Sequence, residues 1–193
     1  MKNLVSLLVI IVSFSTYSQT FNIEEVMKMD YSQLYDTYGK DNIKKEIDRD
    51  YEDNPIGYAA RIYANSNDEL RISFGEDKSY TNISGITLKK KNSRWILPYG
   101  LKVGNKLSEV IEINGKDFSF YAFEGDLHGL CNNWNGGKLD SYNLIVHFTP
   151  NPNINVNMFD EKYRGIYGNG SVESSNEALE TLDIEVFRIE FSK

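Results

Sequence analysis

Three aromatic side chains are spaced so that they could form a binding surface. Tyr121 and Phe123 alternate within the segment 118–123, which predicts that both rings lie on one face of a strand. Trp134 ends the next expected strand. Aromatic side chains suit protein interfaces because they bury a large area at little cost in rotamer freedom, and their faces also suit stacking on sugars. We expect these three residues to bind a ligand on an open sheet face, or alternatively to pack beneath the segment 149–181.

A second group combines two carboxylates with an imidazole. Glu124, Asp126 and His128 occur at every second position, so a regular strand would place them on one face, where they could hold a divalent metal. Gly125 and Gly129 lie in the same stretch and favour a turn, which would break the alternation. The sequence therefore predicts a solvated loop without a metal ion or other cofactor, with these three residues as the alternative metal site.

The residues needed for nucleophilic catalysis are scarce. The chain has two histidines and one cysteine, Cys131, which follows Leu130 in an apolar stretch and is predicted to be a buried thiol. No catalytic residue is assigned. A hydrolase would have to use a pair of carboxylates, and the sequence singles out no such pair among 28 Asp and Glu side chains. Enzymatic activity is left open, with a non-catalytic role preferred.

Composition limits the class of protein. The chain has 193 residues and a formal net charge of −7, which argues against a general nucleic-acid-binding protein because such proteins need a basic surface. An aromatic content of 13% argues against an acidic disordered tail. A chain of this length can bury roughly two-thirds of its unfolded surface. One cysteine cannot form an intramolecular disulfide, so packing must hold the fold together.

The first residues have the pattern of an export signal. A lysine precedes the apolar run 4–14, which is shorter than the about 20 residues of a membrane-spanning helix. Thr16 and Ser18 are small residues that suit cleavage before Gln19. We expect residues 1–18 to be a signal peptide and the mature chain to be periplasmic or extracellular, without a transmembrane span.

Two stretches of sequence recur in the same order. Residues 31–41 align with 107–117 at an offset of 76, and residues 70–74 align with 144–148 at an offset of 74. In both copies a serine could cap a short helix and a glycine could end it, and strand-like runs follow. The predicted serine caps and terminal glycines are Ser32, Ser108, Gly39 and Gly115.

This recurrence predicts two α+β units that together form one continuous body. The first unit spans 19–98, and the second spans 99–193 with an insertion at 149–181 that lacks sustained periodicity. Independent occurrence of similar capping and strand chemistry is the alternative explanation. The expected strands are 57–64, 69–74, 82–89, 118–123, 128–134, 142–148 and 182–191, and a short helix is expected near 174–182.

The start of the second unit carries a family resemblance. The run Tyr99-Gly100-Leu101-Lys102-Val103-Gly104-Asn105-Lys106-Leu107-Ser108-Glu109-Val110, followed by Asn114-Gly115-Lys116, resembles the β-lactamase-inhibitor-protein-like repeat, which also occurs in small outer-membrane assembly lipoproteins. The stretch is also similar to uncharacterised exported bacterial proteins. The resemblance implies helices packed on one face of an antiparallel sheet, with an open face that can bind a protein. The chain lacks the lipid-bearing cysteine of those lipoproteins and the disulfides typical of the inhibitors.

These observations lead to one expected architecture and two expected functions. We expect an α+β fold of tandem helix-plus-antiparallel-sheet repeats, with the helices on one sheet face. The first expected function is that of an exported bacterial binding protein, which contacts a protein or a cell-envelope component through the open face. The alternative is a secreted carboxylate-dependent hydrolase that acts on glycan or peptidoglycan. The sequence leaves the partner's identity and the oligomeric state open.

Overall fold

The computed structural model of the chain describes residues 21–168 and 170–193. The predicted signal peptide, residues 1–18, therefore lies outside the described residues. Within the described ranges, no helix combines the length and the apolar character that a membrane crossing requires.

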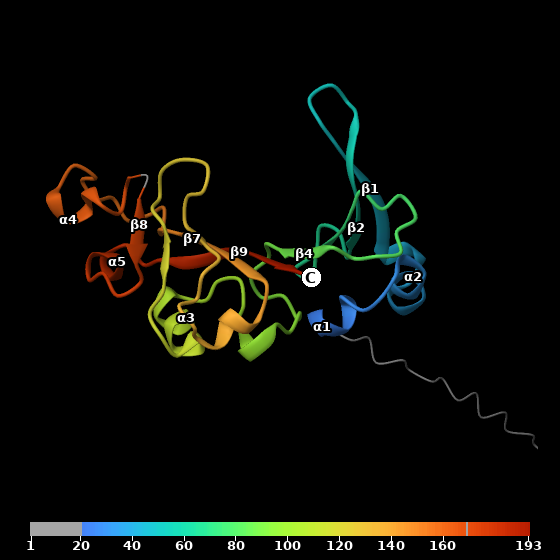
Figure 1. Cartoon of the computed structure of the whole chain (residues 1–193), viewed down its shortest axis with the longest axis horizontal. Coiled ribbons are helices and arrows are strands. Elements are labelled where there is room, and N and C mark those ends of the chain that lie inside the picture. Colours follow the sequence, from blue (N-terminus) through green and yellow to red (C-terminus); the bar gives the residue numbers. More distant parts are fainter. Residues whose placement is uncertain (1–20, 169) are drawn as a thin grey trace, which may run out of the picture.

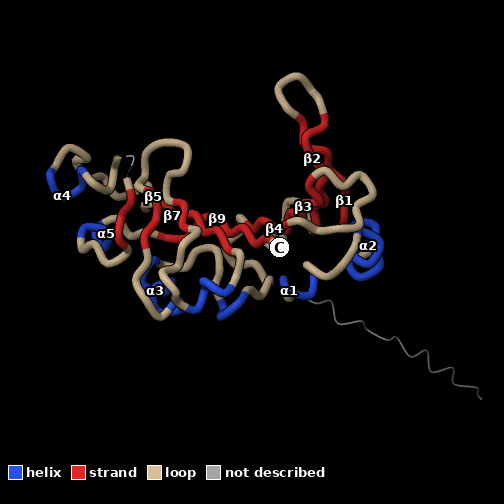
Figure 2. Tube along the Cα trace, viewed as in Figure 1, coloured by secondary structure: helices blue, strands red, loops and turns tan. Residues whose placement is uncertain are grey.

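The centre of the molecule is a seven-stranded antiparallel sheet in the order β1-β2-β3-β4-β9-β7-β6 (Figure 2). A separate antiparallel pair, β5 and β8, lies beside β6 and β7. The strand bounds are β1 Ile43–Arg49, β2 Pro55–Ile62, β3 Leu70–Gly75, β4 Gly85–Leu88, β5 Ser119–Tyr121, β6 Leu130–Cys131, β7 Leu144–Thr149, β8 Ser171–Glu173 and β9 Glu185–Ser192. Together with the helices, this sheet confirms the predicted α+β class.

Short helices complete the fold. Figure 1 shows α1 and α3 on one side of the sheet, below β4 and β9, and α2 beside β1. Two further helices, α4 and α5, lie at the end of the molecule that holds β8 (Figure 1). The bounds are α1 Ile23–Val26, α2 Tyr31–Tyr38, α3 Leu107–Asn114, α4 Glu161–Arg164 and α5 Ala178–Thr181, with 3₁₀ turns at Lys40–Asn42, Pro98–Gly100 and Lys138–Ser141.

One face of the sheet forms the core because alternate strand residues are apolar. On β3, Leu70, Ile72 and Phe74 are buried, while the residues between them are half-buried. Paired residues on neighbouring strands share a face, so Ile72 is followed across the sheet by Ile86 and then Phe191, both of them buried. α1, α2 and α3 contribute buried residues to this core, and among the described residues no helical layer covers the opposite face (Figure 1).

The two longer helices begin differently from the prediction. Before α2, Oδ1 of Asp30 accepts the backbone N–H of Gln33 at 2.8 Å, and Oε1 of Gln33 accepts the N–H of Asp30 at 2.9 Å. This reciprocal arrangement satisfies two backbone groups that the helix start would otherwise leave unpaired. At α3, Glu109 Oε2 similarly accepts the N–H of the residue before the helix at 2.7 Å. The predicted serine caps are therefore wrong, and both serines lie in the first turn: Ser32 and Ser108.

The predicted helix ends are confirmed. Gly39 and Gly115 follow the last helical residues with φ angles of 85° and 75°. Residues other than glycine rarely adopt these angles, because a Cβ would approach the backbone too closely.

Two strands, β1 and β8, were not predicted, and others are shorter than expected. β1 was not predicted, because as a half-exposed edge strand it carries polar residues at most positions. The expected strands 118–123 and 128–134 are paired only at β5 and β6. The expected insertion contains α4 and β8, and the short helix expected near 174–182 is α5.

The aligned stretches occupy corresponding elements. α2 and α3 each have eight residues and start 76 positions apart, and β3 and β7 each have six residues and start 74 positions apart. Outward from the central pair, the strand orders β4-β3-β2 and β9-β7-β6 mirror each other. The division into units 19–98 and 99–193 and the duplication behind it stay predictions.

Candidate functional site

The structure does not bring the three predicted aromatic residues onto one face. Trp134 belongs to the core: it is 1% exposed, its Nε1 donates to the carbonyl of Leu144 at 3.2 Å, and its ring centroid lies 4.9 Å from that of Phe118. A turn between Phe123 and Trp134 interrupts the strand alternation on which the prediction depended. This corrects the expected placement of Trp134.

The other two aromatic rings have different surroundings. Phe123 is half-buried, with its ring centroid 5.6 Å from Phe120 and 6.3 Å from Tyr167, which belongs to the segment 149–181. The packing beneath that segment, which was the alternative, therefore applies to Phe123. Tyr121 is 41% exposed and is the one predicted residue of the three whose ring lies open on the surface.

The group of two carboxylates and an imidazole is an exposed turn. Glu124, Asp126 and His128 are all exposed, and Nδ1 of His128 lies 3.0 Å from the carbonyl oxygen of Gly125. The described ranges contain no group of three or more His, Cys, Asp or Glu side chains that could hold a metal ion. The alternative metal site is therefore not assembled.

Cys131 has the surroundings of a structural thiol. Its side chain is 1% exposed, and burial raises its pKa to about 12. Because the thiolate is the nucleophilic form, this thiol is unreactive near neutral pH.

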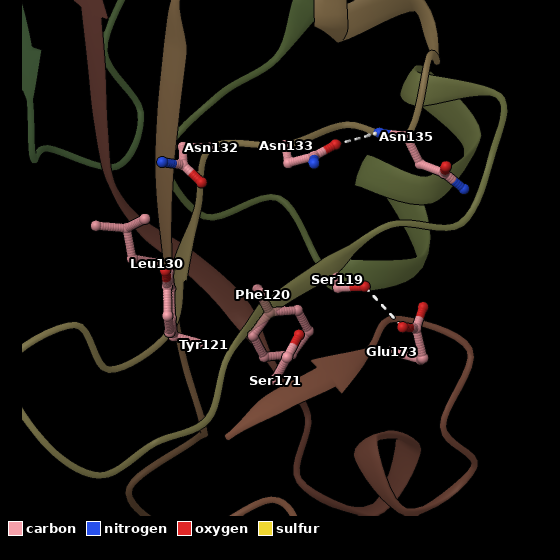
Figure 3. Close-up of a pocket in the computed structure, with 9 residues that line it drawn as sticks. All are labelled: Ser119, Phe120, Tyr121, Leu130, Asn132, Asn133, Asn135, Ser171 and Glu173. Atoms are coloured by element: carbon pink, nitrogen blue, oxygen red, sulfur yellow. Dashed lines mark hydrogen bonds between the residues drawn. The ribbon is translucent and has the colours of Figure 1, made fainter. Parts of the chain in front are cut away.

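Tyr121 lines a surface cavity of about 480 Å³, which we call the β5–β6 groove (Figure 3). Phe120, Tyr121 and Leu130 supply its apolar lining. The remaining lining residues end in amide, hydroxyl or carboxylate groups: Ser119, Asn132, Asn133, Asn135, Ser171 and Glu173. Of all these side chains, Glu173 is the charged one.

Strand pairing positions one wall of the groove. β5 pairs with β8 in the register Ser119↔Glu173 and Tyr121↔Ser171, and together with Phe120 this ribbon supplies five of the lining residues. The hydroxyl of Ser119 donates to Oε1 of Glu173 at 2.7 Å and fixes the carboxylate beside the cavity (Figure 3).

The opposite wall consists of β6 and the residues that follow it, and hydrogen bonds connect it to the last residue of β5 and to the chain just before β5. At one end the N–H of Gly129 donates to the carbonyl of Tyr121 at 2.9 Å. At the other end Nδ2 of Asn135 donates to the carbonyl of Asp117 at 3.2 Å, and its N–H donates to Oδ1 of Asn133 at 3.0 Å (Figure 3). Between these ties the two walls separate and form the groove.

Sequence reasoning missed most of the groove. Its polar residues come from three stretches, and two of them lie about forty residues apart with no shared motif. The one local signal for the groove was the density of asparagines around Trp134, and such a density is equally typical of a turn.

The sheet face opposite the helices carries ion pairs. Arg61 on β2 bonds to Glu46 and Glu69, with both nitrogen–oxygen distances at 2.7 Å. On the neighbouring strand Arg71 pairs with Asp48. Arg61 and Arg71 are directly paired in the sheet and share this face.

The ion-paired layer continues on the other half of the face. Nη2 of Arg188 lies 2.8 Å from both Nε2 of His147 and Oε1 of Glu190. The hydrogen bond with His147 and the charge of Arg188 hold the pKa of Glu190 below its usual range. The polar layer is continuous across the sheet, because Glu190 on β9 lies in register with Thr87 on β4. Thr87 in turn lies in register with Arg71 on β3.

Exposed apolar side chains stand on the projections beside this face. Tyr51, 95% exposed, lies in the β1–β2 turn, Ile56 lies at the start of β2 directly after that turn, and Leu127 lies in the turn 124–129. Figure 1 shows that the hairpin and this turn extend from the sheet on the side away from α1 and α3. We call Tyr51, Ile56 and Leu127 the rim residues.

A second cavity of about 470 Å³ lies between α3 and α5 and contains two carboxylates, Glu180 and Asp183. Nζ of Lys106 lies 2.7 Å from Oδ1 of Asp183, and Nδ2 of Asn151 donates to its Oδ2 at 2.9 Å. The hydrogen bond from Lys106 and that from Asn151 lower the pKa of Asp183, so this carboxylate stays ionised at neutral pH.

Comparison with known proteins gives no relative: no family model, no curated protein and no solved structure matches the chain. The resemblance to the β-lactamase-inhibitor-protein-like repeat therefore stays a prediction.

Proposed function

We propose that the chain is an exported, non-catalytic binding protein that contacts a protein partner through the sheet face opposite the helices. The observation that carries this proposal is the placement of the rim residues. Tyr51, Ile56 and Leu127 are large, apolar and exposed, and they stand on projections on the side of the open face. Exposed apolar groups beside a polar surface are typical of protein interaction sites.

The ion pairs of the open face fit the same role. Arg61, Arg71 and Arg188 are held in fixed positions by carboxylates, with about a third of each side chain still exposed. Arginine is enriched in protein interfaces, and fixed charges give an interface specificity and a faster rate of association. A partner would therefore meet apolar anchors at the rim and an ordered charged layer between them.

The carboxylates of the cavities give less support to a secreted hydrolase. A glycosidase needs two carboxyl groups, one of them with a pKa raised so that it can act as a general acid. The β5–β6 groove contains one carboxylate, Glu173. In the second cavity, the hydrogen bonds from Lys106 and Asn151 lower the pKa of Asp183, so this carboxylate lacks the raised pKa of a general acid.

The proposal can be tested with a rim variant, Tyr51→Ala/Ile56→Ala/Leu127→Ala. Exported and envelope proteins would be captured on the immobilised chain and identified by mass spectrometry. We expect a partner that binds the wild type and is lost with the rim variant. Once purified, this partner should bind the rim variant at least about tenfold more weakly than the wild type.

A matched control is available on the helical side. Ile96 and Tyr99 are also large and exposed, and Ile96 bonds to the chain that leads into α1. The variant Ile96→Ala/Tyr99→Ala should capture the partner as the wild type does. Equal capture by wild type, rim variant and control would contradict the proposal.

A further inference from the structure

We propose that the β5–β6 groove is a binding site for a neutral carbohydrate chain. This inference is independent of the proposed protein-binding face, because it concerns a different set of residues. Three features of the groove favour a sugar: the chemistry of its lining, the exposed tyrosine ring, and the hydrogen bonds that hold part of the polar lining in place.

The lining matches the hydroxyl groups of a sugar. Six side chains around the cavity of about 480 Å³ end in amide, hydroxyl or carboxylate groups. An amide offers both a donor and an acceptor, and a hydroxyl can act as either, so this set can pair with sugar hydroxyls in both directions. The volume lies within the range of about 300–1,000 Å³ that is usual for ligand sites.

The charge of the lining favours a neutral ligand over an anionic one. Among the described residues, neither lysine nor arginine lines the cavity, and its charged side chain is the carboxylate of Glu173. A phosphate or a uronic acid would meet this carboxylate without a compensating cation. Because Ser119 occupies Oε1 of Glu173, Oε2 can accept a hydrogen bond from a ligand hydroxyl.

Tyr121 supplies the apolar surface that sugar recognition needs. Its side chain is 41% exposed and comes from the β5–β8 wall, and Figure 3 shows it beside Leu130 of the facing wall. A sugar ring has an apolar face of C–H groups that can stack on an aromatic ring, while its hydroxyl edge faces polar groups. Ser171 is the strand partner of Tyr121 on the same wall, and Asn132 follows β6 on the opposite wall.

The two walls of the groove and part of its polar lining are held in place before any ligand arrives. Gly129 and Asn135 tie the two walls together at opposite ends of the groove, and Ser119 fixes Glu173. Binding to such a site costs less conformational entropy than binding to a site that must first be ordered. With a single carboxylate, the groove has the means to bind a glycan but lacks the pair needed to hydrolyse it.

The test is titration calorimetry with neutral oligosaccharides as probes: the hexasaccharides of α-1,4-glucose, β-1,4-glucose, β-1,3-glucose and β-1,4-N-acetylglucosamine, with oligogalacturonate as the anionic comparison. We expect at least one neutral probe to bind, and oligogalacturonate to bind more weakly. Absence of binding by every neutral probe at millimolar concentration, or binding of oligogalacturonate alone, would overturn the proposal.

Three groove variants and one control variant test whether the sugar binds at the groove. Tyr121→Ala and Asn132→Ala should each weaken binding by about tenfold, whereas Tyr121→Phe keeps the ring and should keep most of the affinity. Tyr51→Ala removes a more exposed tyrosine outside the groove and should leave sugar binding unchanged. Equal affinity in wild type and Tyr121→Ala would place the sugar elsewhere and overturn the proposal. The thermal transition of each variant, followed by circular dichroism, verifies that it is folded.

The two proposals can be tested independently of each other. The rim variant should lose the protein partner and keep the sugar, and Tyr121→Ala should lose the sugar and keep the protein partner.

Discussion

At the scale of single residues, Gly129 connects the two walls of the groove through its backbone hydrogen bonds. Gly129 has a φ of 67°, donates its N–H to Tyr121 and accepts the N–H of Phe148 at 2.8 Å. A Cβ at this position would lie 2.0 Å from the carbonyl oxygen of Phe148. The backbone of β7 therefore approaches Gly129 so closely that no side chain fits.

We expect Gly129→Ala to lower the free energy of unfolding by about 3 kcal/mol, through left-handed strain and the clash with β7. Gly165→Ala is the control, because open space surrounds a Cβ there, and it should change stability by less than about 0.5 kcal/mol. Urea denaturation measures both values. Similar stability of the two variants would show that β7 can move away without cost.

The raised pKa of Cys131 predicts a pH dependence of stability. Burial raises the pKa of the thiol in the folded protein to about 12, whereas the pKa of an unfolded thiol is about 8.5. The contribution to stability is therefore complete below pH of about 8.5 and is lost as the pH rises toward the folded pKa. The free energy of unfolding should fall more steeply between pH 8 and pH 11 for the wild type than for Cys131→Ala, which cannot titrate. Parallel pH profiles would contradict this assignment.

At the scale of elements, local side-chain bonds fix helix starts and turns. Asp30 and Gln33 start α2 through a reciprocal pair of bonds. Asp77 has a similar role in the turn between β3 and β4: its Oδ2 accepts the backbone N–H groups of Thr81 and Asn82, both at 2.9 Å. The hydroxyl of Ser79 also bonds to Asp77. This one carboxylate therefore accepts hydrogen bonds from three residues of the turn: Ser79, Thr81 and Asn82.

The Asp77 turn should be sensitive to acid. Hydrogen bonds from Ser79, Asn82 and Thr81 hold the pKa of Asp77 well below its usual range. Its contribution to stability is present above the unfolded pKa of about 3.9 and is lost as the pH falls toward the folded value. Asp77→Ala should lower the melting temperature at pH 7 and flatten its decline between pH 4.5 and pH 2. Glu76→Ala, at the neighbouring exposed carboxylate, should keep the wild-type profile, and a shared profile for both variants would refute the role of Asp77.

At the scale of the whole molecule, β9 joins the two halves of the sheet. It pairs with β4 of the first half in the register Ile86↔Phe191 and with β7 of the second half in the register Val146↔Ile189. Its buried residues Val186, Ile189 and Phe191 belong to the core. The sheet therefore runs without a break from one predicted unit to the other.

This continuity predicts that neither unit folds alone. Residues 19–98 without β9 would expose the edge of β4 together with the buried row that includes Ile86. A fragment of these residues should lack a cooperative thermal transition and should associate in size-exclusion chromatography. A chain that lacks only Lys193 is the control and should melt as the full chain does. A cooperative transition in the isolated fragment would instead establish an independent domain.

The sequence by itself determined the α+β class, the glycines that end α2 and α3, the buried thiol of Cys131 and the turn around Gly125. Each follows from local chemistry: alternation of apolar residues, the freedom of glycine to adopt positive φ, or an apolar neighbourhood. Only the tertiary structure decided which aromatic rings are open. Alternation assigns Tyr121 and Trp134 to strand faces, but the packing of distant elements determines which ring is covered, and it buries Trp134 while leaving Tyr121 exposed. The β5–β6 groove depends on tertiary structure for the same reason, because its two walls meet only when the β5–β8 ribbon and β6 pack side by side.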